Sequence, residues 1–346
     1  MVGMGRYSWG VLVVALVGCG DSTGDDDAGA GDAATTVATT DGSAPTTTGM
    51  SALETDADAS SSGGAEETTT GELDCTLPEP PLSAEMFTDV FNGSEDLVFD
   101  GAGNMLAKQG PDIVAVDAAG QTSPFATAPG PSYGLRMMSN GDVVIARWMD
   151  QVLTRVSAGG KPVDIATGLM MPNGMFVDLE DRIWFTDPGQ ASIFRVENDG
   201  TVTQVIAGAE ATAGGGIVYD EERSMLWYTA WEYGQLRRLE IDAMGNPGKF
   251  EIVLTADGLV QGITLDRCGN LYLVDQRDGE LLRVEIDDAG QPVGDPVTLA
   301  SIPSDIYSAQ FGRGPGFSPT SLYIIGNPGA VYEVDVGIPG ADVPPS

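Results

Sequence analysis

The chain has 346 residues and a formal net charge of −35, with 16 lysine and arginine residues against 51 aspartate and glutamate residues. Nucleic-acid binding needs clustered cations, so we expect no nucleic-acid partner. The chain contains no histidine, which excludes Ser-His-Asp and Cys-His catalysis and histidine-ligated zinc. Any chemistry must therefore use carboxylates, amides, lysine, tyrosine or an oxygen-bound metal.

Residues 1–19 are predicted to be a lipoprotein signal peptide. Arg6 is the only charged residue before a short apolar run, Val11 to Val17, which is too short to span a membrane. The run ends in Leu-Val-Gly-Cys, which resembles the bacterial lipobox, whose cysteine becomes the acylated N-terminus. We expect lipidation of Cys19, export to the bacterial cell envelope and membrane attachment through this anchor only. A plain secretory signal is the alternative.

Residues 20–77 are predicted to be a disordered acidic linker. Up to about residue 74 they are mostly Asp, Thr, Ala, Gly, Ser and Glu, with no lysine or arginine. Such a segment buries too little apolar surface to offset the entropy lost on ordering. We therefore expect the folded part of the chain to begin near residue 78.

From residue 78 the chain repeats one pattern, two short apolar strands joined by a polar turn. In Met171 to Asp187, a Pro-Asn-Gly turn precedes one strand at Met175 to Val177 and a second follows at Ile183 to Phe185. Six such units begin 38 to 47 residues apart, at Glu95, Tyr133, Asn173, Gly215, Gln261 and Ser308.

A four-stranded repeat of about 40 to 45 residues is the signature of a β-propeller blade. We predict an all-β fold, a six-bladed β-propeller over 78–340, with a short tail at 341–346. The segment Met86 to Phe91 is expected to add the outermost strand of the last blade and close the ring. A two-sheet sandwich is the alternative, and the regular period argues against it.

Side chains within the repeats have expected structural roles. Trp184 and Trp227 alternate with apolar residues and are predicted to pack between blades. Cys75 and Cys268 can form a disulfide in an oxidising compartment, the alternative being two free thiols. Four aspartates are expected to cap strand-to-strand turns, namely Asp100, Asp178, Asp220 and Asp266.

The innermost strand of each blade begins at one mouth of the central channel, so the six first residues of the units should form a ring there. The ends of the second strands reach the same face. A polar mouth with aromatic residues is the default binding-site hypothesis, and we expect a small-molecule or glycan ligand and a monomeric protein. The predicted substrate-binding residues are Tyr133, Arg147, Trp148, Trp231 and Ser308.

Four motifs stand out along the repeats, namely Glu95-Asp96-Leu97-Val98-Phe99-Asp100, Pro172-Asn173-Gly174, Trp184-Phe185-Thr186-Asp187-Pro188 and Gly262-Ile263-Thr264-Leu265-Asp266. Together they resemble the SMP-30/gluconolactonase/luciferin-regenerating-enzyme family over roughly residues 85–338. The resemblance implies a six-bladed propeller with calcium or zinc in its channel and hydrolysis of lactones or related esters.

By this resemblance Glu95 and Asn173 correspond to family residues at the metal. Gly215 stands where the family has an asparagine ligand, and Gln261 where it has an aspartate that is both ligand and base. We expect a weak cation site at Glu95, Asn173 and Gln261, because one carboxylate is few for calcium. Asp187 and Asp275 are candidate replacement bases.

Two functions remain open from the sequence. The first is a metal-dependent hydrolase of lactones or related esters. The second is a non-catalytic propeller that binds a small molecule, glycan or protein at the same mouth.

Overall fold

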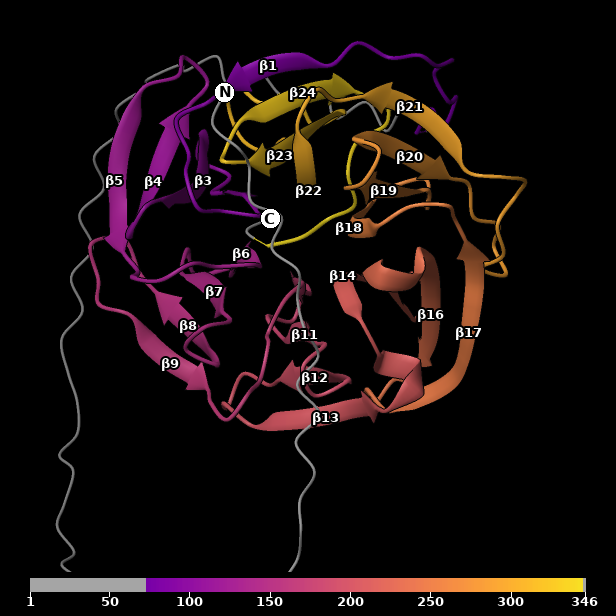
Figure 1. The fold of residues 1–346 in the computed structure, drawn as a ribbon, viewed down its shortest axis with the longest axis horizontal. Coiled ribbons are helices and arrows are strands. Elements are labelled where there is room, and N and C mark those ends of the chain that lie inside the picture. Colours follow the sequence, from indigo (N-terminus) through magenta and orange to yellow (C-terminus); the bar gives the residue numbers. More distant parts are fainter. Residues whose placement is uncertain (1–72, 345–346) are drawn as a thin grey trace, which may run out of the picture. The chain divides into compact units, whose positions relative to one another are not determined.

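Six four-stranded antiparallel sheets surround a central channel in the computed structural model, which describes residues 73–344 (Figure 1). The predicted six-bladed β-propeller is therefore confirmed. The signal peptide, Cys19 and nearly all of the predicted linker lie outside the described residues.

Each blade runs from an inner strand beside the channel to an outer edge strand. The first blade contains β2 (Val98–Phe99), β3 (Asn104–Gln109), β4 (Asp112–Asp117) and β5 (Thr122–Thr127). The second contains β6 (Leu135–Met137), β7 (Val143–Arg147), β8 (Val152–Val156) and β9 (Val163–Ala166). The third contains β10 (Met175–Val177), β11 (Ile183–Asp187), β12 (Ser192–Val196) and β13 (Val202–Ala207).

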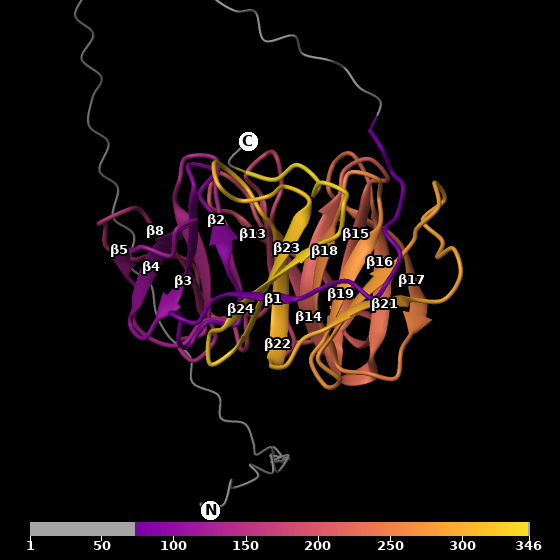
Figure 2. The same ribbon diagram turned by 90° about the horizontal axis from the view of Figure 1, so that it is seen from above.

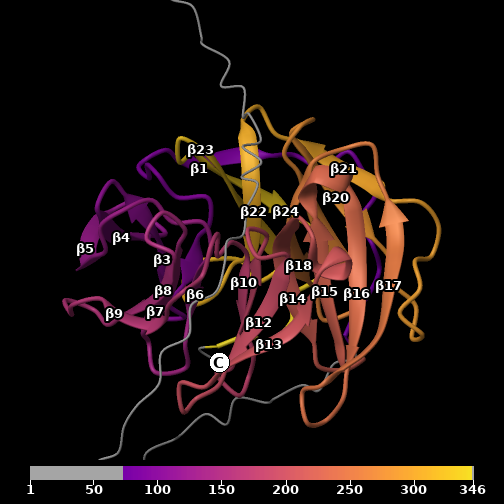
Figure 3. The ribbon, with the colours of Figure 1, turned by 60° about the horizontal axis from the view of Figure 1, so that its bottom comes forward.

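The inner strands β10, β14, β18 and β22 follow one another around the channel (Figure 3). The fourth blade contains β14 (Gly214–Asp220), β15 (Met225–Ala230), β16 (Gln235–Ile241) and β17 (Pro247–Thr255). The fifth contains β18 (Val260–Leu265), β19 (Leu271–Asp275), β20 (Glu280–Val284) and β21 (Val297–Ser301). The sixth contains β22 (Asp305–Phe311), β23 (Ser321–Asn327), β24 (Val331–Asp335) and β1 (Glu85–Thr88).

The ring is closed by β1, which pairs antiparallel with β24 as the outermost strand of the sixth blade (Figure 2). This confirms the predicted closure and corrects its bounds, since the strand ends at Thr88 and not at Phe91. The chain leaves the sheet there because Phe91 is buried against the first blade, in a cluster with Phe99.

Large aromatic residues fill the space between blades, as predicted. Trp184 and Trp227 are both fully buried, and Trp184 stacks on Tyr219 of the next blade with ring centroids 5.4 Å apart. The indole Nε1 of Trp184 donates to the Asp178 carboxylate at 2.8 Å. The aromatic core and the turn below it are thus connected by one aspartate.

The four turn aspartates cap backbone amides as expected. Asp100 accepts from the Asn104 amide at 2.9 Å, and Asp178 from the Arg182 amide at 2.9 Å. Asp220 and Asp266 do the same for amides of their own turns. These carboxylates hold the turns at the face away from the predicted mouth.

The predicted disulfide between Cys75 and Cys268 is present, with the two Cα atoms 5.8 Å apart across a separation of 193 residues. It ties the segment before β1 to the turn between β18 and β19. Helical structure in residues 73–344 is limited to two 3-10 turns, η1 (Ala209–Ala211) and η2 (Trp231–Tyr233), and no helix of this part could span a membrane.

Candidate functional site at the channel mouth

Five of the six predicted ring positions meet in a small pocket at the start of the inner strands, which we call the mouth pit. The pit has a volume of about 30 Å³, enough for one or two water-sized groups. It is also lined by three polar or charged side chains that were not predicted as site residues, those of Asp96, Arg136 and Tyr307. The predicted residues that line it are Glu95, Tyr133, Asn173, Gln261 and Ser308.

The pit is narrow because glycines follow three of its lining residues, Tyr133, Asn173 and Gln261, and let neighbouring inner strands approach closely. A Cβ on Gly134 would lie 2.5 Å from the Asn173 carbonyl oxygen, and one on Gly262 would lie 2.6 Å from the Tyr307 carbonyl oxygen. Real side chains do not tolerate such contacts with backbone. The repeated glycine therefore sets the diameter of the channel mouth.

Irregular strand pairing occurs at the same positions in blades four to six. The register between inner and second strands shifts at Gly214 to Ile217, at Val260 to Ile263 and at Ile306 to Ser308. Such bulges re-aim side chains and are frequent beside functional sites. They accompany the placement of Gln261, Tyr307 and Ser308 at the pit.

Glu95 carries the only carboxylate in the pit that is left without a partner in the described part of the chain. It makes no hydrogen bond or ion pair there, and its side chain is half-buried. Burial, together with the charge of Asp96, raises the pKa of Glu95 to about 8. A carboxylate held this way favours a proton, a cation or a hydrogen-bond donor.

Asp96 is engaged on all sides by protein. It forms an ion pair with Arg136 and accepts from the Leu135 amide at 3.1 Å. The Ser308 hydroxyl donates to it at 2.7 Å. Ser308 was predicted to bind substrate, but its hydroxyl already donates its one hydrogen bond to Asp96 within the protein.

Two phenols flank Glu95. Burial, with the Glu95 charge, raises the pKa of Tyr133 to about 12 and also raises the pKa of Tyr307. Both hydroxyls therefore keep their protons near neutral pH and can donate hydrogen bonds. Trp148 stacks on Tyr133 with centroids 5.3 Å apart, so this indole supports the pit from outside.

The two other predicted binding residues lie outside the pit lining. Arg147 is tied within its own blade, with Nη2 at 2.5 Å from Asp150 and Nη1 at 3.3 Å from the Thr154 hydroxyl. Trp231 begins η2 and is half-buried. The Cβ of Trp231 lies 3.5 Å from the position that a Cβ on Gly215 would occupy.

Asp187 and Asp275 also lie outside the pit lining, and both are buried. Asp187 accepts from the amides of Met170 and Met171, each at 2.8 Å. Asp275 accepts from the Leu259 amide at 3.1 Å and the Arg277 amide at 2.9 Å. Both carboxylates organise loops, and no contact connects them with Glu95.

Gly215 contributes no side chain to the ring of residues at the mouth, and the atoms packed around it leave no space for one. A Cβ there would lie 2.6 Å from the Thr229 hydroxyl and 3.0 Å from the Gln261 carbonyl oxygen. The Thr229 hydroxyl occupies this space because it donates to the Gln261 carbonyl at 2.7 Å. An asparagine at this position would need both groups to move.

The oxygen donors of the pit suit a hard divalent cation of modest affinity. Glu95 supplies one charge, and Asn173 and Gln261 supply amide oxygens. In residues 73–344 no cluster of three or more acidic, histidine or cysteine residues could hold a metal ion. The pit matches one ion in size, and water would complete its coordination.

The residues that sequence reasoning missed had weak signals. Asp96 directly follows Glu95, and Tyr307 directly precedes Ser308. Alternation along a strand would point them away from the channel, and bends and bulges in the chain overturn that expectation. Arg136, within β6, projects into the channel and lines the pit from below.

No family model matches this chain, and no curated protein matches it in sequence. Several solved structures, however, match its fold. A gluconolactonase from Xanthomonas campestris covers 77% of this chain and 96% of its own, at 17% identity and a TM-score of 0.62. The chain shares the fold of this protein. A luciferin-regenerating enzyme covers 76% of this chain and 98% of its own, at 14% identity and a TM-score of 0.62.

A third propeller with this fold is regucalcin from Agrobacterium tumefaciens, described as a calcium-binding protein. It covers 76% of this chain and 97% of its own, at 17% identity and a TM-score of 0.59. These three structures confirm, at the level of fold, the family resemblance carried by the sequence motifs.

Proposed function

We propose that this propeller hydrolyses a lactone or related ester at the channel mouth. The observation that carries the proposal is the unpartnered Glu95 carboxylate, set among amide and phenol groups in the mouth pit. The shared fold with a gluconolactonase supports the same reaction class.

Glu95, Asn173 and Gln261 would hold a divalent cation, for which calcium is the better match because all three donors are oxygens. When bound, such a cation polarises a carbonyl and acidifies water. The calcium-binding description of the regucalcin structure supports this choice.

The residues of the chain define what happens around the pit. Because the pit has room for only one or two water-sized groups, the substrate ring must lie above it, near Tyr133 and Trp231. Without a bound cation the pKa of Glu95 is raised to about 8, so its carboxylate can accept a proton from water only at alkaline pH, and a cation held by the same carboxylate would lower this pKa. The protonated phenols of Tyr133 and Tyr307 can donate to the oxygen that gains charge.

A non-catalytic role is the second candidate, and one observation favours it. Asp187 and Asp275 are held by backbone amides, so Glu95 would have to serve as both cation ligand and base. Under this alternative the mouth binds a small molecule, a glycan or a protein without reaction.

The test is hydrolysis of glucono-δ-lactone and γ-butyrolactone at pH 9, with calcium, zinc or manganese supplied, by wild-type protein and Glu95→Gln. We expect the wild-type protein to hydrolyse the lactones and Glu95→Gln to lose this activity. The near-ultraviolet circular dichroism spectrum of the variant should match that of the wild type. Glu85→Gln, an exposed change on β1, is the matched control. No hydrolysis and no cation-induced thermal stabilisation of the wild type would favour the binding role, and activity retained by Glu95→Gln would move the reaction elsewhere.

We further propose that the protein is exported and lipid-anchored through Cys19, as a monomer. The Cys75–Cys268 disulfide supports an oxidising compartment. Mass spectrometry of the membrane fraction tests the anchor, because Cys19→Ser should abolish acylation and release the protein from the membrane.

A further inference from the structure

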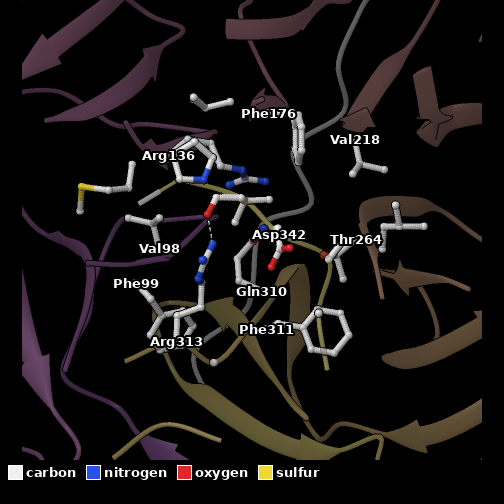
Figure 4. A pocket seen from close by; sticks show the side chains of 18 of the residues that line it. Val98, Phe99, Arg136, Phe176, Val218, Thr264, Gln310, Phe311, Arg313 and Asp342 are labelled. Atoms are coloured by element: carbon white, nitrogen blue, oxygen red, sulfur yellow. Dashed lines mark hydrogen bonds between the residues drawn. The ribbon is translucent and has the colours of Figure 1, made fainter. Parts of the chain in front are cut away.

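A second and larger cavity lies deeper in the central channel, and we call it the channel cavity. Its volume is about 440 Å³, within the range of roughly 300 to 1,000 Å³ typical of pockets for small organic molecules. Its walls come from inner-strand residues further along from the mouth (Figure 4). Among them are the apolar side chains of Val98, Phe176, Val218 and Phe311.

Arg136 separates the two spaces. It lines both the mouth pit and the channel cavity, and its guanidinium is held by Asp96. The channel cavity is therefore distinct from the proposed hydrolytic site, and the inference drawn from it does not rest on that function.

The charge of the channel cavity is opposite to that of the protein. Its charged lining residues are Arg136, Arg267 and Arg313 against one acid, Asp342. Counting Asp96, the partner of Arg136, one guanidinium is still left uncompensated. In a chain with 16 basic and 51 acidic residues, this concentration of arginine in one apolar cavity points to an anionic ligand.

Arg313 is the uncompensated cation. It is half-buried, and no carboxylate lies within 4.0 Å of it in the described part of the chain. Its one hydrogen bond goes from Nη1 to the Val343 carbonyl, drawn as a dashed line in Figure 4. Its other N–H groups are available to a carboxylate.

Gln310 adds a second recognition group in the same cavity. Its Nε2 is buried and has no hydrogen-bond acceptor among residues 73–344. A buried donor without an acceptor is costly, and a ligand oxygen would relieve that cost. Figure 4 shows Gln310 and Arg313 projecting toward the middle of the cavity from the sixth-blade side.

Residues 339–344 cross the end of the channel cavity opposite the mouth as a strap. Three backbone hydrogen bonds hold it: the Ala341 amide donates to the Leu265 carbonyl at 3.0 Å, the Gly340 amide to the Pro319 carbonyl at 3.1 Å, and the Arg267 amide to the Pro339 carbonyl at 2.9 Å. The Arg313 guanidinium adds its bond to the Val343 carbonyl. Arg267 also pairs with Asp342 at 2.5 Å, and both side chains are exposed. Local opening of such a segment gives a ligand its way in.

We propose that the channel cavity binds a small organic carboxylate with an apolar body. Its carboxylate accepts from Arg313 and Gln310, and its apolar part packs against Val98, Phe176 and Val218. The strap closes over the bound ligand.

Calorimetric titration with octanoate tests this, compared with octanol and octylamine, which share the apolar body but lack the negative charge. Octanoate should bind saturably, with one site per chain and at least tenfold more tightly than either analogue. Equal affinity for octanol, or no octanoate binding at millimolar concentration, would overturn the proposal.

Two variants locate the site. Arg313→Gln and Gln310→Leu should each weaken octanoate binding by tenfold or more, while Arg155→Gln, an exposed charge change on the second blade, should leave it unchanged. Gln310→Leu keeps every charge, so it remains informative if Arg313→Gln does not fold. Octanoate binding unaffected by Gln310→Leu and by any folded Arg313 variant would show that the cavity is not the site.

Discussion

The hydroxyl of Ser308 donates a hydrogen bond to the carboxylate of Asp96 at 2.7 Å, although the two residues are 212 positions apart. Ser308 belongs to the inner strand of the sixth blade, and Asp96 lies two residues before β2, the inner strand of the first. Asp96 also forms an ion pair with Arg136 of the second blade. One buried carboxylate therefore connects three blades beneath the mouth pit, in addition to the closure by β1.

Removing this connection should destabilise the ring. We expect Asp96→Asn to lower the free energy of unfolding by about 3 kcal/mol, because it leaves the Arg136 guanidinium without its buried partner. Ser308→Ala should cost about 1 kcal/mol, the net worth of one hydrogen bond. Urea denaturation measures both, and Arg155→Gln should stay within about 0.5 kcal/mol. An Asp96→Asn variant as stable as that control would remove Asp96 from this role.

The raised pKa of Glu95 predicts how stability depends on pH. Burial raises this pKa from 4.5 to about 8, so between these values the folded protein keeps a proton that the unfolded chain has lost. Unfolding free energy should therefore fall as pH rises across this window. Glu95→Gln should lack this part of the decline, making the two proteins differ by about 1–3 kcal/mol between pH 5 and pH 9. Parallel pH profiles from urea denaturation would show that Glu95 is not perturbed.

A second carboxylate in the mouth pit should strengthen cation binding. We expect Gln261→Asp to tighten calcium affinity roughly tenfold or more at pH 9, because charge count among the ligands tunes such sites. Calorimetric titration with calcium chloride measures the effect. Gln121→Asp adds the same charge at an exposed turn and should leave affinity unchanged. Equal gains in both variants would indicate a general electrostatic effect and no site at the pit.

The glycines that follow Tyr133, Asn173 and Gln261 should be intolerant of even a methyl group. Gly262→Ala would place a Cβ 2.6 Å from the Tyr307 carbonyl oxygen, which the backbone must move to relieve. We expect a loss of about 2–4 kcal/mol in unfolding free energy. Gly248→Ala, whose nearest contact is the Glu240 Cβ at 3.1 Å, should cost less than about 1 kcal/mol. Similar urea midpoints for the two variants would contradict tight inner-strand packing.

The sequence alone determined the architecture, because the evidence for a propeller is local and repeated. Two apolar runs at a regular spacing recur six times, and a turn aspartate recurs in four of these units, so errors in one unit are corrected by the others. The same repetition identified Glu95, Tyr133, Asn173, Gln261 and Ser308 as one ring, since equivalent positions in equivalent blades face the same channel. The cysteine pair was also visible, with its alternative open until the fold brought the two residues together.

The tertiary structure decided what these residues are free to do. Whether a carboxylate is available depends on neighbours distant in sequence: Asp187 and Asp275 are occupied by loop amides, Asp96 by two other blades, and only Glu95 is left unpartnered in the pit. These hydrogen bonds and ion pairs form where chain segments distant in sequence approach each other, and the repeat pattern of the sequence does not predict which segments do so. For the same reason the channel cavity had no signal in the sequence, because its arginine residues come from three different blades and meet only when the ring closes.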